Sequence, residues 1–261
     1  MPEGKSSRLP SLKDIPETAW QKLGQKRIFF GHQSVGFNII GGMKSLLKEN
    51  QQIKINIVQA KDPSEAQTPG FVYFWVGENT DTKSKIDAFL AYMEKGNGNR
   101  PDIAFFKFCF VDFSAASDIP KVFSDYKVAM GRLEKAFPGT TFVHVTVPLT
   151  GMPTGIEGWI RRGKNLVKEV IGKPIFDLRD NTKRYQFNEV MRKEYEGKAA
   201  FFDLARIEST FPDGRRAFFS EGGKAYPSLV PDYTYDGGHL NDKGRKVIAE
   251  QLLIFLAALP R

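Results

Sequence analysis

The sequence has little cysteine and histidine, and it contains no long hydrophobic run. Its 261 residues include a single cysteine, Cys109, and three histidines. One cysteine excludes an intrachain disulfide framework and any multi-cysteine zinc or iron–sulfur site. The longest apolar stretch covers residues 252–259, whereas a bilayer-spanning helix needs about 20 apolar residues. We therefore expect no transmembrane segment.

The N-terminus also lacks the apolar core of a signal peptide. A cytoplasmic protein and an exported protein in its mature form are both compatible with this feature. Hydrophobic residues make up 41% of the chain and charged residues 26%. These fractions are ordinary for a globular protein and exclude a chain that is disordered throughout.

The charge balance does not identify a partner. The net charge is +8, from 38 basic and 30 acidic residues spread along the chain. Such a charge is compatible with nucleic acid, anionic lipid, acidic polysaccharide or no specific partner. The densest basic cluster lies beside Trp159 and consists of Arg161, Arg162, Lys164 and Lys168. A solvated helix face and an anion-binding lid are the two interpretations of this cluster.

Apolar segments and helical patterns alternate along the chain. Strands are predicted at residues 27–31, 53–59, 102–113, 141–149 and 199–205. Helices are predicted over 32–50, 83–95, 126–137, 185–195 and 241–258. Residues 60–82 read as a long loop, residues 150–180 have no clear pattern, and residues 1–16 form a flexible lead-in to a single domain over 17–261.

Strands that are apolar on both faces favour a mostly parallel sheet with helices on either side. We therefore predict an α/β fold, a three-layer α/β/α sandwich with a mostly parallel five-stranded sheet. No internal repeat, dinucleotide fingerprint or P-loop is present. Ligands of such sheets bind at the carboxyl ends of the strands, so functional residues are expected there.

The first candidate is Ser34, which lies in a glycine-flanked turn between the first strand and its helix. Such a turn exposes a hydroxyl and aims the N–H groups of the helix at it. A helix N-cap is the alternative interpretation.

The second candidate is the pair Asp236 and His239, separated by two glycines just before the last helix. A tight turn there lets the carboxylate reach the imidazole Nδ1 and leaves the other ring nitrogen free to take a proton from a serine. A serine hydroxyl needs such a base to attack an ester. A solvent-facing turn with an incidental histidine is the alternative.

Together these segments resemble the SGNH hydrolases, the GDSL esterase/lipase superfamily. FGHQSVG at residues 30–36 is similar to the family's first block, and YDGGHLN at 235–241 is similar to its last. The resemblance covers most of the chain. It implies a three-layer α/β/α sandwich with a nucleophilic Ser34, a base His239 and an orienting Asp236, and it implies no cofactor or metal.

The sequence departs from the family pattern in two blocks. The usual Gly-Asp-Ser is replaced by Gly31-His32-Gln33-Ser34, and the third block retains only Asp112, with Val111 in place of the oxyanion-binding asparagine. Loss of one oxyanion donor costs on the order of 10²–10³ in rate. The resemblance suggests the N–H groups of Ser34 and Gly77 as donors, with the Asn79 amide as a substitute. For Gly77 and Asn79, a plain turn is the alternative.

His32, Gln33 and Asp112 are further pocket candidates, although a hydrogen-bonded structural role is favoured for His32. His144 is expected to be a satisfied core histidine and Cys109 a buried, inert thiol. Asn188 and Glu208 have no evident chemical role. Tyr73, Phe74, Trp75 and Trp159 either line a sugar or polyanion cleft or belong to the core and its rim.

The sequence therefore predicts a serine esterase that cleaves a small acyl ester through an acyl-enzyme. An acetylated carbohydrate is the suggested substrate, by analogy alone. The alternatives are an acyltransferase that uses the same serine, and an inactive module that binds a polyanion or a protein partner. No nucleic-acid partner is expected.

Overall fold

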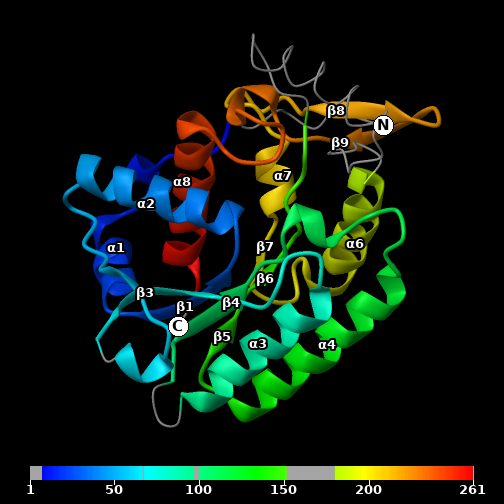
Figure 1. Cartoon of the computed structure of the whole chain (residues 1–261). Helices are drawn as coiled ribbons and strands as arrows, with labels where there is room; N and C mark the ends of the chain where they lie inside the picture. The colour runs from blue at the N-terminus through cyan, green and yellow to red at the C-terminus, as the bar shows by residue number, and fades with distance from the viewer. Residues whose placement is uncertain (1–7, 67, 97–99, 152–179, 261) are drawn as a thin grey trace.

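The computed structural model describes residues 8–66, 68–96, 100–151 and 180–260 (Figure 1). Its central sheet has five strands in the order β2-β3-β1-β4-β5, and every pairing is parallel. The strands are β1 (Arg27–His32), β2 (Ile57–Gln59), β3 (Gly70–Trp75), β4 (Ile103–Phe106) and β5 (Thr141–Phe142). The mostly parallel five-stranded sheet predicted from the sequence is confirmed.

Two smaller pairs of strands accompany this sheet. Strand β6 (His144–Val145) pairs in parallel with β7 (Phe201–Phe202). Strands β8 (Phe218–Glu221) and β9 (Lys224–Pro227) form an antiparallel hairpin.

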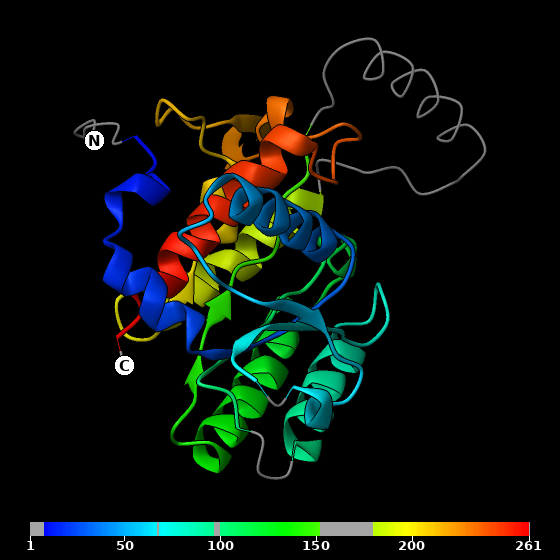
Figure 2. The same ribbon diagram turned by 90° about the vertical axis from the view of Figure 1, so that its left-hand side faces the viewer.

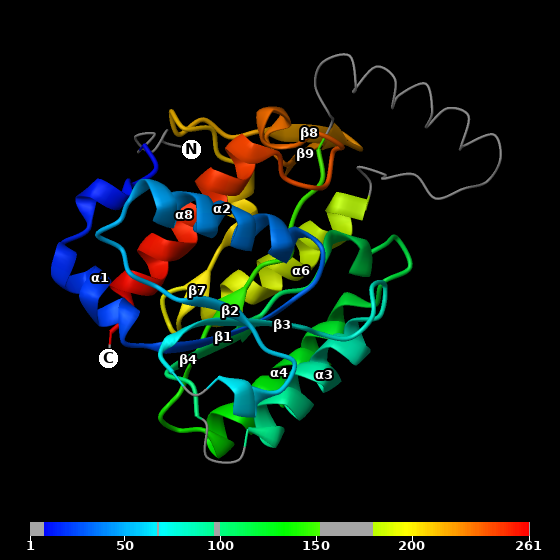
Figure 3. The same ribbon diagram turned by 60° about the vertical axis from the view of Figure 1, so that its left-hand side comes forward.

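Helices cover both faces of the central sheet, which gives the three predicted layers (Figures 1 and 3). One face packs against α1 (Glu17–Gly24), α2 (Val35–Glu49) and α8 (Asp242–Ala258). The other packs against α3 (Thr82–Lys95), α4 (Ile119–Ala136) and α6 (Asp180–Tyr195). The short helix α7 (Leu204–Glu208) follows β7. Four 3₁₀ turns complete the described elements: η1 (Leu12–Asp14), η2 (Pro63–Glu65), η3 (Phe110–Asp112) and η4 (Pro231–Tyr233).

The strands separate two hydrophobic cores because successive side chains point to opposite faces. In β1, Ile28 and Phe30 belong to the core beneath α2 and α8, whereas Phe29 belongs to the core beneath α3 and α4. Strand β3 divides in the same way, with Tyr73 on the first side and Phe74 on the second. Burial on both faces explains why these strands have no polar alternation.

Strand β3 contradicts the prediction of a long loop over residues 60–82. Its apolar run is short and is enclosed by loop residues rich in proline, glycine and asparagine, which obscure it in the sequence. The predicted strand at 199–205 yields only β7, which pairs with β6 outside the five-stranded sheet. The chain turns helical from Leu204, where Asp203 caps α7 by accepting a hydrogen bond from the backbone N–H of Arg206.

Two other predicted strands are shorter than expected. The run over 102–113 ends as a strand at Phe106, and η3 follows it. The run over 141–149 forms the separate strands β5 and β6. Both runs continue as buried chain beyond their strands, so apolar character here marks burial and not sheet pairing.

Part of the predicted lead-in is packed against the last helix. Leu12 is buried, and its backbone N–H donates to the Glu250 carboxylate at 2.9 Å. The Gln251 amide donates to the Pro10 carbonyl oxygen at 2.8 Å. Figure 2 shows the N-terminal segment lying along the same side of the molecule as α8. The flexible lead-in predicted over residues 1–16 is therefore anchored from Pro10 onward.

The apolar end of α8 is a core element. Leu252, Leu253 and Leu256 are each at most 2% exposed. Within the described residues, no helix combines the length and the apolar character needed to cross a bilayer.

The contact between α2 and α8 supplies a test of the packing. A methyl group added at Gly42 would lie 2.2 Å from the Arg245 carbonyl oxygen, whereas one at Gly41 would meet no atom within 4 Å. We expect Gly42→Ala to lower the free energy of unfolding by about 1–3 kcal/mol through overpacking. Gly41→Ala should raise it by up to about 1 kcal/mol through helix propensity. Urea denaturation of both variants measures the difference, and equal stabilities would contradict the close approach of the helices.

Candidate active site

Ser34 occupies a strained turn between β1 and α2. Its φ of 47° and ψ of −105° lie in a region that non-glycine residues rarely adopt. Ser34 is the N-cap residue of α2 by position, but its side chain makes no capping hydrogen bond to the helix. Such strain persists only where the surrounding structure enforces it and is common at functional sites.

The hydroxyl of Ser34 instead meets His239. Ser34 Oγ lies 2.7 Å from His239 Nε2, and His239 Nδ1 lies 2.7 Å from Asp236 Oδ2. A carboxylate at Nδ1 holds the proton on that nitrogen and leaves Nε2 to accept the serine proton. The structure therefore brings together, as one hydrogen-bonded chain, the three residues that the sequence suggested.

Asp236 is held as a carboxylate. Burial acts to raise the pKa of Asp236, but hydrogen bonds from the His239 ring and from the backbone N–H groups of His239 and Gly238 outweigh it and lower the pKa to about 2. The backbone bonds are 2.7 Å from His239 and 2.8 Å from Gly238. A negative charge therefore faces the imidazole throughout the neutral range.

The turn that carries Asp236 and His239 needs its two glycines. Gly237 has a φ of +88°, which favours glycine. A side chain at Gly238 would lie 2.6 Å from the Phe110 ring. The N–H of Gly151, which lies in a neighbouring segment of the same chain, donates to the Gly237 carbonyl oxygen at 2.8 Å and fixes the turn.

Gln33 connects the Ser34 turn to the loop after β3. Its side-chain amide donates to the carbonyl oxygens of Val76, at 3.1 Å, and Gly77. Gly77 has a φ of +48°, and an added Cβ would lie 2.5 Å from the Lys85 nitrogen. No described residue accepts a hydrogen bond from the backbone N–H of Ser34 or Gly77. Gln33 is thus a link between loops, and both N–H groups remain available as donors.

Asp112 faces the protein interior and not a pocket. Both of its oxygens accept hydrogen bonds from Lys85 Nζ, at 2.8 and 2.6 Å, and both side chains are fully buried. Asp112 also accepts from the backbone N–H groups of Thr80 at 2.9 Å and Cys109 at 2.6 Å. Asn79 lies on the exposed side of this pair, and its Oδ1 accepts from Lys85 Nζ at 3.0 Å. The pocket role expected for Asp112 is replaced by a structural one.

Lys85 was missed by the sequence interpretation. It sits on the same buried helix face as Phe89 and Tyr92, at the i+4 and i+7 spacing of an apolar stripe. A lysine at that position signals a buried cation that needs a partner. That signal was present in the sequence.

His32 is a buried histidine packed among rings and not a hydrogen-bonded one. Neither ring nitrogen has a hydrogen-bond partner among the described residues. Its ring centroid lies 4.7–6.0 Å from those of four aromatic side chains: Phe30, Phe37, Tyr73 and Trp75. Burial, with the nearby charge of Lys107, lowers the pKa of His32 to about 3. The imidazole therefore stays neutral in the folded protein.

The other polar candidates stabilise the interior. The His144 ring stacks on Tyr195 at 3.5 Å between centroids, and its Nδ1 lies 2.9 Å from the Tyr126 hydroxyl. Cys109 is buried. Both predictions of structural roles agree with these positions.

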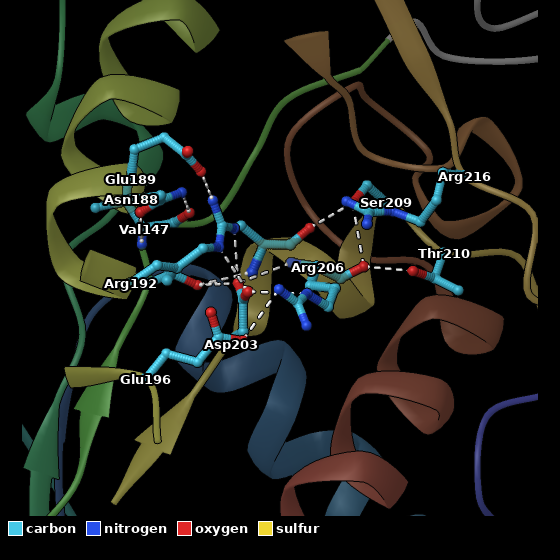
Figure 4. A network of polar contacts seen from close by, with 12 residues as sticks. Val147, Asn188, Glu189, Arg192, Glu196, Asp203, Arg206, Ser209, Thr210 and Arg216 are labelled. Carbon is cyan, nitrogen blue, oxygen red and sulfur yellow. Dashed lines mark hydrogen bonds and ion pairs between the residues drawn. The ribbon is translucent and has the colours of Figure 1, made fainter. Parts of the chain in front are cut away.

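Asn188 and Glu208 bind the chain that follows β6. The Asn188 amide accepts from the Val147 N–H at 2.7 Å and donates to the Val147 carbonyl oxygen at 3.0 Å. Figure 4 shows Asn188 and Val147 beside the polar network of Arg192, Asp203 and Arg206. Glu208 accepts from the Leu149 N–H at 2.7 Å, and burial raises its pKa to about 8. Both residues hold backbone groups that lack a sheet partner.

The aromatic candidates divide between core and surface. Tyr73 and Phe74 are buried on opposite faces of the sheet. Trp75 is 53% exposed and packs edge-on against Phe37, with ring centroids 4.8 Å apart. Trp159 and the basic cluster at Arg161, Arg162, Lys164 and Lys168 lie outside the described residues. Among the residues described, no group of three His, Cys, Asp or Glu side chains is arranged to hold a metal ion.

The neutral buried state of His32 predicts a pH-dependent stability. The unfolded imidazole has a pKa near 6.5 and the folded one near 3, so the unfolded state binds more protons between these values. The contribution of His32 to stability should be complete above pH 6.5 and fall toward pH 3, by up to about 1.4 kcal/mol per pH unit. His144, whose pKa burial lowers to about 4, adds to the slope.

Urea denaturation from pH 7.5 to pH 4.5 measures this slope. The variant His32→Phe should flatten it and leave the contribution of His144. An unchanged slope in this variant would contradict a neutral, buried His32.

Comparison with known proteins supports the fold. No protein family and no curated protein matches the chain by sequence. Among solved structures, it is similar to a protein from Streptococcus pneumonia provisionally described as a platelet activating factor, with 14% identity, 94% of each chain covered and a TM-score of 0.53.

Two further structures align with lower TM-scores. The periplasmic domain of the Salmonella ser. Paratyphi A lipopolysaccharide acetyltransferase has 12% identity, 91% of this chain and 88% of that chain covered, and a TM-score of 0.45. A provisionally described GDSL-like lipase from Parabacteroides merdae has 13% identity, with 89% and 95% covered and a TM-score of 0.45. At 14% identity and a TM-score of 0.53, the Streptococcus structure supports the three-layer α/β/α fold and nothing more. The other two matches, with TM-scores of 0.45, carry no argument.

Proposed function

We propose that this protein is a serine esterase of the SGNH type, with Ser34 as nucleophile. The observation that carries the proposal is the hydrogen-bonded chain from Ser34 through His239 to Asp236, with 2.7 Å between hydroxyl and imidazole and 2.7 Å between imidazole and carboxylate. Its place after the first strand of a parallel sheet is where such folds bind ligands.

The chemistry follows from this geometry. His239 Nε2 takes the hydroxyl proton as Ser34 Oγ attacks the carbonyl carbon of an ester. Asp236 stabilises the imidazolium, which then protonates the departing alcohol. Water, deprotonated by His239, hydrolyses the acyl-enzyme, and the carboxylic acid leaves with Ser34 restored. No cofactor takes part in this sequence.

The oxyanion of each tetrahedral intermediate requires donors close to Ser34. The backbone N–H groups of Ser34 and Gly77 are unused among the described residues, and Gln33 holds their two loops together. We assign both N–H groups and the Asn79 side-chain amide to the oxyanion hole. Donors of this kind contribute mainly in the transition state.

The proposed substrate is a small acyl ester, with an acetylated carbohydrate as the favoured class. Supporting this class, the exposed rings of Trp75 and Phe37 lie beside the Ser34 turn. Flat, partly exposed rings present an apolar surface with a wet edge.

A fluorophosphonate probe tests the nucleophile directly. We expect one adduct on Ser34, located by mass spectrometry, and loss of labelling in Ser34→Ala and His239→Ala. Asp236→Asn should reduce ester hydrolysis by up to about 10⁴-fold, because the imidazole tautomer is no longer fixed. Ser64→Ala, at an exposed serine of η2, is the matched control and should behave as the wild type. A folded wild-type protein without an adduct on Ser34 would refute the proposal.

Two alternatives have their own measurements. An acyltransferase would use the same serine, and added saccharide would speed turnover of its acyl-enzyme and yield an acylated sugar. An inactive module would bind a polyanion in a salt-sensitive way, and Ser34→Ala would not affect this binding.

A further inference from the structure

The loop that supplies Gly77 and Asn79 is fixed by a buried cation. Lys85 Nζ lies 2.8 and 2.6 Å from the two oxygens of Asp112 and 3.0 Å from Asn79 Oδ1. An ammonium group has three hydrogens to donate, and these three contacts use them all. The side chain of Lys85 is 0% exposed, so its ammonium group depends on these protein partners.

The partner carboxylate is equally committed. Besides Lys85, Asp112 binds the backbone N–H of Thr80 from the loop after β3 and that of Cys109 from the chain after β4. One ion pair thus ties two loops at the carboxyl end of the sheet. A buried ion pair stabilises a fold little more than apolar residues of similar volume do, so we expect its main effect on the residues that it contacts.

The ion pair also sets the orientation of the Asn79 amide. An ammonium group donates and cannot accept, so Lys85 selects the amide oxygen and turns Nδ2 away from itself. No described residue accepts a hydrogen bond from Nδ2, and the residue is exposed. Gln33 holds the same loop against the Ser34 turn through Val76 and Gly77. Asn79 therefore carries two unused N–H bonds on the loop that Gln33 joins to the Ser34 turn.

We propose that Lys85, paired with Asp112, is a positioning residue that presents the Asn79 amide to the oxyanion. The inference rests on the esterase function proposed above. It explains how the site works with Val111 at the position of the asparagine in the third block: the amide comes from a different loop and is oriented by a buried charge.

A mutant cycle tests this coupling. Asn79→Ala should lower kcat about 10²- to 10³-fold and leave KM nearly unchanged, because the amide acts on the transition state. The double variant Lys85→Met/Asp112→Asn removes both buried charges together and should cause a similar fall. Combining all three changes should lower kcat little further, within about twofold of the double variant. A second full loss in the triple variant, or no loss in Asn79→Ala, would overturn the proposal.

The same helix offers a matched control. Lys83 and Asp87 form an exposed ion pair with 2.5 Å between Nζ and Oδ2. Lys83→Met/Asp87→Asn makes the same chemical change on α3 and should leave kcat and KM as in the wild type. If the buried double variant fails to fold, Asn79→Asp replaces it. That variant keeps an acceptor for Lys85 but has no amide hydrogens, and wild-type activity in it would equally refute the proposal.

A readout without substrate separates this inference from the esterase function. The side-chain amide of Asn79 should give a rigid ¹⁵N NMR signal in the wild type and in the exposed-pair control, and a mobile one in Lys85→Met/Asp112→Asn. A rigid amide with no labelling of Ser34 by fluorophosphonate would overturn the esterase function alone. A mobile amide in the wild type would overturn the positioning role while labelling of Ser34 persists.

Discussion

The packing of α2 against α8 is the contact on which the candidate site depends. Ser34 is the residue before α2, and His239 lies three residues before α8, so the distance between the Ser34 hydroxyl and the His239 ring follows from how these helices meet. The close approach at Gly42 and Arg245 brings the helices together. The N–H of Leu240 also donates to the Asn38 side chain in the first turns of α2, at 3.1 Å. Ser34 and His239, which are hydrogen-bonded to each other, thus come from distant parts of the chain but from one packed layer of helices.

The residues that we propose for the oxyanion hole on the far side of Ser34 belong to the opposite layer. Gly77 and Asn79 precede α3, and the N-terminal turn of that helix lies directly behind Gly77. Lys85 projects from the same helix to Asp112 after β4. The Gln33 amide joins this half to the strained Ser34 turn. Ser34 is thus held between elements of both helical layers, which explains how a φ of 47° at a serine is maintained.

The sequence was informative where local chemistry decides the structure. Two glycines between Asp236 and His239 permit a tight turn, and the apolar strands leave a parallel sheet as the simplest arrangement. The sequence was uninformative where the role of a residue depends on partners that lie far from it along the chain. Strand β3 is hidden by the loop residues around it. The roles of Asp112 and Gln33 depend on Lys85 and on the Val76–Gly77 carbonyls, which lie far from them in sequence. His32 was expected to form a hydrogen bond, but it is buried among aromatic rings, and this burial together with the charge of Lys107 lowers its pKa and keeps the imidazole neutral.

The departures of the sequence from the SGNH blocks affect backbone donors and side-chain donors differently. A backbone N–H donor depends on chain geometry and not on side-chain identity, so the N–H groups of Ser34 and Gly77 tolerate changes in the residues around them. A side-chain donor is different, because its amide must be oriented as well as present. Oriented by its backbone alone, an exposed asparagine would sample several rotamers and would lose conformational entropy on binding the oxyanion. In the arrangement that we propose, the buried ammonium of Lys85, with its fixed counter-ion, would remove that freedom before substrate arrives. Such pre-organisation would allow the Asn79 amide to replace a donor from the strand end.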